Sequence, residues 1–256
     1  MSFDLNEKIG LIKNETLENL RDSYYVENLI MKIGIFGGKP NQIPEFLKPF
    51  FGGLNLWQNP NQLAKFLVLL SNYRIRSYAE IGAYFGGTFI TICEYLKRFN
   101  FDFQKAYAID PNSYYVGSDM ANKKSLLDEY IIYNSDINRK IAERKKHNEF
   151  EFDFKSMKAK SADAFKAMKE DHIDFVFIDG NHDIKNVLED FENARKLNAK
   201  IIAIHDINSV CDDSWKKIIK DYSKDYDAKE IRDIYSDKYN YFGFGIMIKK
   251  GKEVKS

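Results

Sequence analysis

A glycine-rich turn between two short apolar segments constrains this chain more than any other feature. Residues 78–81 form a strand-like segment, residues 82–88 read G-A-Y-F-G-G-T, and the next apolar segment ends at Asp110. A strand that runs into a glycine turn and opens a helix, followed by a strand that ends in a carboxylate, is how an open α/β sheet holds an adenosine. Glycines at Gly82 and Gly86 would let the backbone approach a ligand, because a Cβ would occupy that space. The pattern predicts that Asp110 accepts hydrogen bonds from two ribose hydroxyls.

The turn differs from the fingerprint of dinucleotide-binding proteins, which is G-x-G-x-x-G. From Gly82 the chain reads G-x-x-x-G-G-T, so no second glycine stands where a pyrophosphate would approach. This difference argues against NAD as the ligand.

From residue 76 onward, short apolar segments alternate with amphipathic ones. Such alternation is typical of parallel βαβ units, and two β-prone runs between residues 228 and 250 predict an antiparallel hairpin after them. We therefore expect an α/β fold with a doubly wound, Rossmann-like, mostly parallel sheet that a C-terminal hairpin completes. The parallel strands are predicted at about 76–82, 105–110, 151–157, 173–179 and 200–205.

The glycine turn resembles the first motif of class I S-adenosylmethionine (SAM)-dependent methyltransferases. That motif is an acidic residue, a hydrophobic residue and G-x-x-x-G, and residues 80–86 read E-I-G-A-Y-F-G. Three further segments are similar to the subgroup of cephalosporin-hydroxylase-like proteins and macrolide-sugar O-methyltransferases: W-Q-N-P at 57–60, I-D-G-N-H-D at 178–183 and I-H-D-I at 204–207. The resemblance covers roughly residues 55–249 and implies SAM as the cofactor.

The resemblance also implies which residues contact that cofactor. Around the glycine turn and the fourth predicted strand these are Glu80, Gly82, Tyr84, Gly86, Thr88, Asp110 and Asp179. Related methyltransferases seat the adenine after the third strand, which implies Ala162 and Asp163, with the carboxylate accepting from the exocyclic amine. Alternatively, Asp163 caps a helix over residues 164–169. Gln58 is a further candidate contact, although a loop before a helix explains the same segment.

The chain divides into a helical N-terminal extension, 1–72, packed on a methyltransferase domain, 73–250. Apolar spacing predicts a helix over 61–70 that packs against the sheet. The insertion 112–149 is too long for a simple loop, and we expect it to form a helical cap that closes over the site as a lid. Its tyrosines form either a wall for the acceptor or the hydrophobic face of the cap helices; they are Tyr114, Tyr115, Tyr130 and Tyr133.

Acidic, imidazole and amide side chains follow two neighbouring apolar strands. The cluster consists of Asp179, Asn181, His182 and Asp183 after one strand and His205, Asp206 and Asn208 after the next. Polar groups at the mouth of buried strands cost desolvation unless they bind something, so the cluster is a candidate site. Alternatively, Asp183 or Asp206 caps the following helix and the histidines donate to backbone carbonyls.

Two mechanisms fit this cluster. In one, Asp179, His205 and Asp206 hold a divalent ion that binds the acceptor hydroxyl. In the other, His182 or His205 removes the proton without a metal. The resemblance implies magnesium held by an Asp after the fourth strand and a Glu-Asp pair after the fifth, but His205 stands in the place of that Glu. The substitution weakens the magnesium site, shifts it to manganese or abolishes it. Because both aspartates remain, we favour a metal.

Composition excludes several other classes of protein. With 39 basic and 38 acidic side chains the net charge is +1, so we expect neither nucleic acid nor a membrane surface as a partner. The two cysteines, Cys93 and Cys211, are too few for a disulfide framework. No basic-then-apolar leader opens the chain and no apolar run reaches about 18 residues, so we expect a cytoplasmic protein. The sequence leaves open whether the protein forms a homo-oligomer.

The sequence thus predicts a SAM-dependent O-methyltransferase with a small, polar, sugar-derived acceptor. One alternative is methylation of a phosphoramidate or nucleotide-linked oxygen in surface polysaccharide decoration. An NAD-dependent oxidoreductase is an alternative because it shares the ribose-binding carboxylate. An inactive binding module on the same fold would have lost the polar cluster, which this chain keeps.

Overall fold

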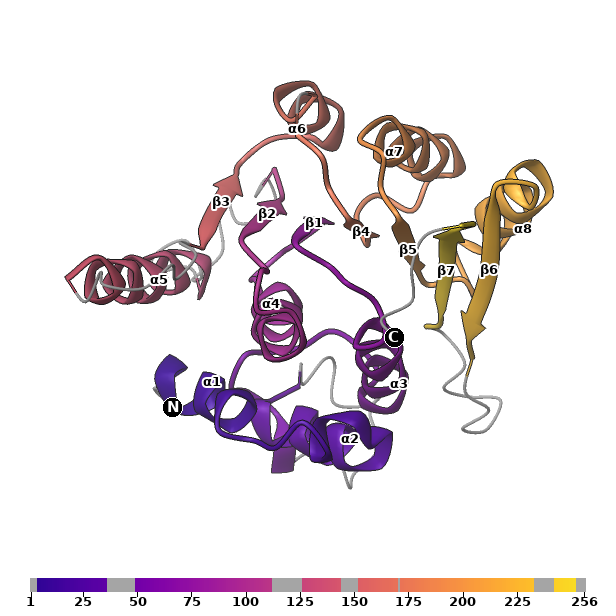
Figure 1. Ribbon diagram of the computed structural model, residues 1–256. Helices are drawn as coiled ribbons and strands as arrows, with labels where there is room; N and C mark the ends of the chain where they lie inside the picture. The colour runs from indigo at the N-terminus through magenta and orange to yellow at the C-terminus, as the bar shows by residue number, and fades with distance from the viewer. Residues whose placement is uncertain are drawn as a thin grey trace, which may run out of the picture.

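A seven-stranded sheet forms the centre of the molecule (Figure 1). The computed structural model describes residues 4–35, 49–111, 126–143, 152–169, 171–232 and 242–251. The strands are β1 Ser77–Ile81, β2 Lys105–Ile109, β3 Asp153–Met157, β4 Phe175–Ile178, β5 Ile201–His205, β6 Tyr226–Ile231 and β7 Phe244–Lys249. They lie in the order β3-β2-β1-β4-β5-β7-β6, with β7 antiparallel to both of its neighbours and the other pairs parallel. The predicted α/β class, the doubly wound parallel sheet and the C-terminal hairpin are confirmed.

Helices cover both faces of this sheet. They are α1 Leu5–Lys13, the short 3-10 helix η1 Asn19–Arg21, α2 Ser23–Ile33, α3 Pro60–Leu70, α4 Gly87–Phe99, α5 Leu126–Glu143, α6 Ser161–Ala167, α7 Ile184–Lys196 and α8 Asp212–Tyr222. Figure 1 shows α3 and α4 on one face, α1 and α2 outside them, and α6, α7 and α8 on the opposite face. Strand order reverses between β1 and β4, and in open α/β sheets ligands bind beyond the carboxyl ends of the strands at that point.

Helix α3 begins where local sequence chemistry places it. The Asn59 side chain accepts hydrogen bonds from the backbone amides of Asn61 and Gln62 at 3.0 and 3.3 Å, and Pro60 occupies the first helical position. Phe66 then stacks on Phe244 of β7 with ring centroids 4.5 Å apart. The predicted helix over 61–70 is therefore confirmed, and it packs on the sheet as expected. Its cap also fixes the loop that leads into it.

The N-terminal helices share one core with the sheet. Ile9 of α1 and Ile30 of α2 belong to the same buried cluster as Phe66 of α3 and Phe175 of β4. On the other face, α6, α7 and α8 bury a second cluster against β1, β2, β4, β5 and β7. Every residue of β4 and β5 is buried, which confirms that these two apolar runs are central strands. The division of the chain at residue 72 stays a prediction.

Helix α5 of the insertion packs beside α4 and β3. Tyr130 is fully buried, and its hydroxyl donates to Glu94 Oε1 at 2.5 Å. Lys97 Nζ donates to that hydroxyl at 3.1 Å and to Asn134 Oδ1 at 3.0 Å. Tyr133 stacks on Tyr130 with ring centroids 6.0 Å apart. The acceptor-wall interpretation is wrong for Tyr130, because its ring is buried between α4 and β3. Tyr114 and Tyr115 lie outside the described residues, so the lid stays a prediction.

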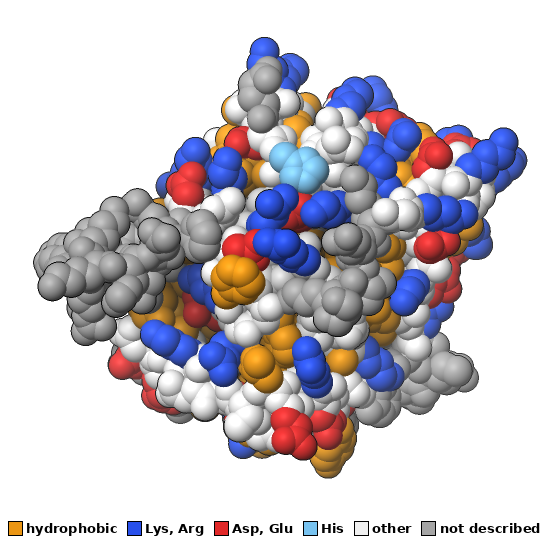
Figure 2. Space-filling model, viewed as in Figure 1, with side chains coloured by type: hydrophobic (Ala, Val, Ile, Leu, Met, Phe, Trp, Pro, Cys, Tyr) orange, Lys and Arg blue, Asp and Glu red, His pale blue; other side chains and the backbone are white. Residues whose placement is uncertain are grey.

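The described surface is mixed in charge. Figure 2 shows lysine and arginine side chains spread over one face, with acidic side chains between them. Cys93, in α4, and Cys211, just before α8, are buried free thiols. Among the described residues, none of the helices combines the length and the apolar content that crossing a bilayer requires.

Candidate active site

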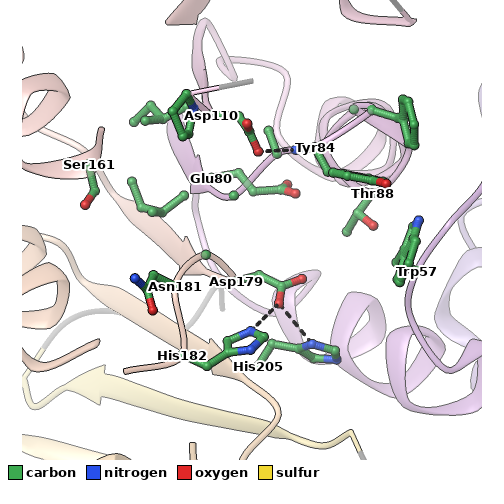
Figure 3. Close-up of a pocket in the computed structure, with 18 of the residues that line it drawn as sticks. Trp57, Glu80, Tyr84, Thr88, Asp110, Ser161, Asp179, Asn181, His182 and His205 are labelled. Carbon is green, nitrogen blue, oxygen red and sulfur yellow. Dashed lines mark hydrogen bonds and ion pairs between the residues drawn. The ribbon is translucent and has the colours of Figure 1, made fainter. Parts of the chain in front are cut away.

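A cavity of about 810 Å³ opens beyond the carboxyl ends of β1, β2, β4 and β5 (Figure 3). Its lining comes from the glycine turn after β1, the strand ends, the loop before α3, the start of α6, and the first half of α7. Of the predicted cofactor contacts, these line it: Gln58, Glu80, Gly82, Tyr84, Gly86, Thr88, Asp110 and Asp179. The cavity therefore lies where the strand order reverses, which is the expected position of a ligand site.

The glycines of the turn are required by neighbouring protein atoms. Gly82 and Gly86 have φ values of +85° and +88°, a backbone conformation that favours glycine. A Cβ at Gly82 would lie 2.1 Å from the carbonyl oxygen of Asp179, and one at Gly86 would lie 2.5 Å from Leu127 Cδ2. The expectation that a Cβ would take the space of a ligand is wrong for both positions. Gly82 is glycine because β1 and the end of β4 approach each other closely.

Asp110 and the turn hold each other in place. The Asp110 side chain follows β2, is 6% exposed, and accepts a hydrogen bond at Oδ2 from the backbone amide of Tyr84 at 2.9 Å. Tyr84 itself has a positive φ of +47°. Figure 3 shows Asp110 and Tyr84 at one end of the cavity. This carboxylate is thereby fixed at the mouth of β2, where the sequence predicted a ribose ligand.

Glu80 forms part of the cavity floor between the two ends. It is 1% exposed and accepts a hydrogen bond from the Tyr78 hydroxyl. Burial raises the pKa of Glu80 well above its ordinary value, the Tyr78 hydrogen bond lowers it, and the negative charges of Asp179 and Asp110 raise it further. Glu80 is therefore held toward its protonated form.

The segment after β3 departs from expectation. Helix α6 begins at Ser161 with Lys160 as its N-cap, so Asp163 lies in the first turn and its predicted capping role is wrong. Neither Ala162 nor Asp163 lines the cavity; the Asp163 carboxylate is exposed and pairs with Lys166 at 3.6 Å. Ser161 and Lys160 line the cavity instead.

Asp190 is a cavity residue that sequence reasoning missed. It lies on α7, is 3% exposed, and lines the cavity beside Ser161 and Asn186. Burial raises its pKa to about 6, against a smaller lowering by a Ser161 hydrogen bond. The available signal was an acid on the apolar face of α7, next to the buried Phe191.

The predicted polar cluster comes together at the other end of the cavity (Figure 3). His205 Nδ1 lies 3.1 Å from Asp179 Oδ1 and 3.4 Å from Asp206 Oδ1. His182 Nε2 lies 3.4 Å from Asp206 Oδ2 and 3.9 Å from Asp179 Oδ1. One ligand atom from each of Asp179, His205 and Asp206 lies within 4.8 Å of the other two. The geometry suits a cation, or protons shared with imidazoles.

Electrostatics make the two aspartates unequal. Burial alone would raise the pKa of Asp179, but His205, His182 and Gln58 together bring it well below its ordinary value. Burial raises the pKa of Asp206, and His205 only partly offsets that effect. Burial lowers the pKa of His205, and the charges of Asp179 and Asp206 outweigh it and raise that pKa overall. Asp179 is thus the anchoring negative charge of the cluster.

The remaining members of the predicted cluster have other contacts. Asn181 lines the cavity, and its Oδ1 accepts from the backbone amide of Asp183 at 3.0 Å. Asp183 is exposed at the N-cap of α7 without a capping hydrogen bond from its side chain. Asn208 pairs with Arg232 and does not line the cavity. Asp206 lies five residues before Cys211, the N-cap of α8, so the side-chain capping alternative is wrong for both aspartates.

Two aromatic residues border the cluster. Phe242 lines the cavity and stacks on the His205 ring with centroids 5.6 Å apart. Trp57 is 44% exposed and meets the Tyr84 ring edge-to-face at 5.3 Å. In Figure 3 the Trp57 ring lies across the cavity from Asn181. Neither aromatic was predicted as a site residue, although Trp57 belongs to the W-Q-N-P segment of the resemblance.

Comparison with known proteins places the chain in a family. A family model described as a methyltransferase domain matches residues 79–207, half of the chain. No curated protein matches significantly.

Structural comparison finds similarity to an O-methyltransferase from Bacillus cereus in complex with SAH. The sequence identity is 15%, the alignment covers 96% of this chain and 97% of that chain, and the TM-score is 0.46. The O-methyltransferase TomG from Streptomyces achromogenes, in complex with SAM, has 13% identity over 97% and 100%, with a TM-score of 0.47. A putative O-methyltransferase from Klebsiella pneumoniae has 11% identity over 97% and 91%, with a TM-score of 0.48. At sequence identities this low, the substrates of these proteins cannot be assigned to this chain.

Proposed function

The chain belongs to the methyltransferase domain family and is a SAM-dependent methyltransferase, and on that premise we propose that it methylates an oxygen of a small, polar, sugar-derived acceptor. One observation carries the proposal: a single cavity joins a buried carboxylate after β2, Asp110, to the cluster of Asp179, His182, His205 and Asp206. The first end suits the ribose of a nucleoside, and the second end suits a hydroxyl that must lose a proton.

The cofactor end is assigned from the lining residues. Asp110 would accept from the ribose hydroxyls, and residues 82–86 would hold the methionine portion. Ser161 and Asp190 would contact the adenine in place of Ala162 and Asp163, since only the former pair lines the cavity. An ionised Asp190 can accept from the exocyclic amine.

The reaction needs little from the protein beyond placement and proton removal. When bound, SAM supplies a methyl group on a positively charged sulfur. The acceptor oxygen forms a bond to the methyl carbon while the carbon–sulfur bond breaks, the sulfur keeps the electron pair, and the oxygen loses its proton. Asp179 and Asp206 orient His182, whose half-exposed ring faces the cavity and receives that proton.

The donor set of the cluster fits a divalent cation. Two carboxylates suit Mg²⁺ or Mn²⁺, and the imidazole of His205 favours Mn²⁺ over Mg²⁺. When bound there, the ion lowers the pKa of the acceptor hydroxyl. Its positive charge would also offset the repulsion between Asp179 and Asp206. Without an ion, protons on the imidazoles of His182 and His205 offset that repulsion.

The charge of the lining favours an uncharged acceptor. Among the described residues that line the cavity, Lys160 is the one lysine or arginine, and it lies beside Ser161 at the adenosine end. The other end offers no arginine or lysine from the described chain to pair with a phosphate. We therefore place a neutral sugar hydroxyl ahead of a phosphoramidate or nucleotide-linked oxygen, with decoration of a surface polysaccharide as the setting.

Methyl-labelled SAM tests this proposal directly. We expect label to move to neutral glycosides, and to sugar phosphates or nucleotide sugars at most a tenth as fast. Mass spectrometry of the products would show one added methyl group on oxygen. Transfer only to phosphate-bearing acceptors, or only to nitrogen, would contradict the proposed acceptor.

The buried Asp190 predicts a pH-dependent stability. Its pKa of about 6 in the folded protein exceeds the ordinary value of 3.8, so the folded state binds this proton more tightly than the unfolded state. The contribution is fully present below pH 3.8 and is lost as pH rises through about 6. Asp190→Asn removes the penalty, and we expect it to gain up to about 3 kcal/mol relative to wild type between pH 4 and pH 7.

Denaturant unfolding of both proteins at the two pH values measures this difference. Asp163→Asn is the matched control, because that carboxylate is exposed, and it should follow wild type at both pH values. Parallel pH profiles for Asp190→Asn and wild type would show that Asp190 is not buried as a neutral acid.

A further inference from the structure

Gln58 reaches the cluster from a distant part of the sequence. It lies 121 residues before Asp179, in the loop between Leu56 and α3, and it is 5% exposed. Its backbone position is well fixed: the Leu56 amide donates to the Gly34 carbonyl at 3.0 Å, and Asn59 caps α3 immediately after it. The side chain therefore has a defined place in the wall of the cavity.

The amide of Gln58 is only half satisfied. Its Nε2 donates to Asp179 Oδ2 at 2.7 Å. Its Oε1 is buried and has no hydrogen-bond partner among the described residues. Because no hydrogen bond holds Oε1 in its present position, a half-turn of the amide group would break no contact at that end. The oxygen is attached to the same amide that touches Asp179, the anchoring charge of the cluster.

We propose that Gln58 is an additional ligand of the divalent cation, binding through Oε1 beside Asp179, His205 and Asp206. The inference rests on the cation of the proposed function. A half-turn about the last side-chain bond exchanges the NH₂ group and the oxygen of the amide. Without a cation the NH₂ group faces the Asp179 carboxylate, and with a cation the oxygen does. Amide oxygens are ordinary ligands of hard divalent ions.

This assignment gives the N-terminal segment a part in the chemistry. The donor set becomes two carboxylates, one amide oxygen and one imidazole, which suits Mn²⁺ better than Mg²⁺ because of the nitrogen. The loop before α3 then contributes a residue to the cation site through the contact of Gln58 with Asp179.

Two substitutions separate a ligand from a residue that only holds Asp179. Gln58→Glu keeps an oxygen but loses the NH₂ donor, whereas Gln58→Ala loses both. If Oε1 binds the ion, Gln58→Glu binds Mn²⁺ at least as tightly as wild type, and Gln58→Ala binds it at least about 10-fold more weakly. Gln104→Ala, at an exposed position before β2, should equal wild type.

Calorimetric titration of the full-length protein with Mn²⁺ alone measures these affinities. Weakening by Gln58→Glu as severe as that by Gln58→Ala would overturn the proposal, because the side chain would then act only as a donor to Asp179. Unchanged binding in Gln58→Ala, or no binding in wild type, would also overturn it. S-adenosylhomocysteine titrated into the same proteins separates this failure from failure of the proposed function: nucleotide binding without the Mn²⁺ pattern removes the ligand assignment alone.

Discussion

We expect Asp179→Asn and Asp206→Asn each to lower the turnover of methyl transfer at least about a hundredfold, while the affinity for SAM changes little. Asparagine keeps the shape of aspartate but removes its negative charge. That charge lies close to His205, whose Nδ1 is 3.1 Å from Asp179 Oδ1 and 3.4 Å from Asp206 Oδ1. The cluster would then bind a cation more weakly and would stabilise a protonated His182 less. The loss falls on the transition state, because the ground-state cofactor contacts lie mainly at the other end of the cavity.

Steady-state and single-turnover rates of the variants measure this loss. Asp183→Asn is the matched control: it lies in the same loop, exposed, and should keep nearly full activity. Exhaustive chelation should reproduce the loss reversibly. If the chelated enzyme keeps full activity while His182→Ala or His205→Ala abolishes it, the metal is excluded and a histidine acts as the base.

We expect Asp110→Ala to weaken the binding of both SAM and S-adenosylhomocysteine by roughly 30-fold or more. Two hydrogen bonds from ribose hydroxyls to a carboxylate are lost, which should cost ~2–4 kcal/mol. The same substitution also frees the Tyr84 amide that Asp110 Oδ2 accepts at 2.9 Å, so the turn loses an anchor. Asp110→Asn keeps an oxygen for that amide and should lose less affinity than alanine.

Calorimetry with S-adenosylhomocysteine gives the comparison. Asp163→Asn should bind as wild type does, because its carboxylate is exposed and outside the cavity. Unchanged affinity in a folded Asp110→Ala variant would remove Asp110 from the cofactor site.

The sheet was predictable because buried parallel strands leave a strong local signal. Runs such as Phe175–Ile178 and Ile201–His205 are almost wholly apolar, and each ends at a polar residue. Since parallel strands present their carboxyl ends along one edge, the convergence of Asp179, His205 and Asp206 followed from topology alone. The hairpin of β6 and β7 was likewise carried by local β-propensity.

The wrong predictions concern features that depend on tertiary packing, which the spacing of residues in the sequence does not determine. Asp163 satisfies an N-cap or the first turn of a helix equally well, because both favour a negative charge at the positive end of the helix dipole. The sequence therefore could not place the start of α6, and Ala162 and Asp163 lie outside the cavity lining.

Gln58 and Asp179 meet across 121 residues, and Asp190 faces the cavity only through the angle at which α7 packs on the sheet. The role of Gly82 was also misread, since the atom that excludes a Cβ there belongs to Asp179. Contacts of this kind need the assembled fold.

Methyl transfer from SAM to an oxygen beside the cluster requires that this cavity bind SAM. Native mass spectrometry of the purified protein tests this binding. The protein is mixed with equimolar SAM, S-adenosylhomocysteine and NAD, and any nucleotide that it retains or takes up is identified. We expect the wild type to bind SAM or S-adenosylhomocysteine and not NAD, and we expect Asp110→Ala to retain neither SAM nor S-adenosylhomocysteine. Retention of NAD by the wild type, with SAM ignored, would contradict it.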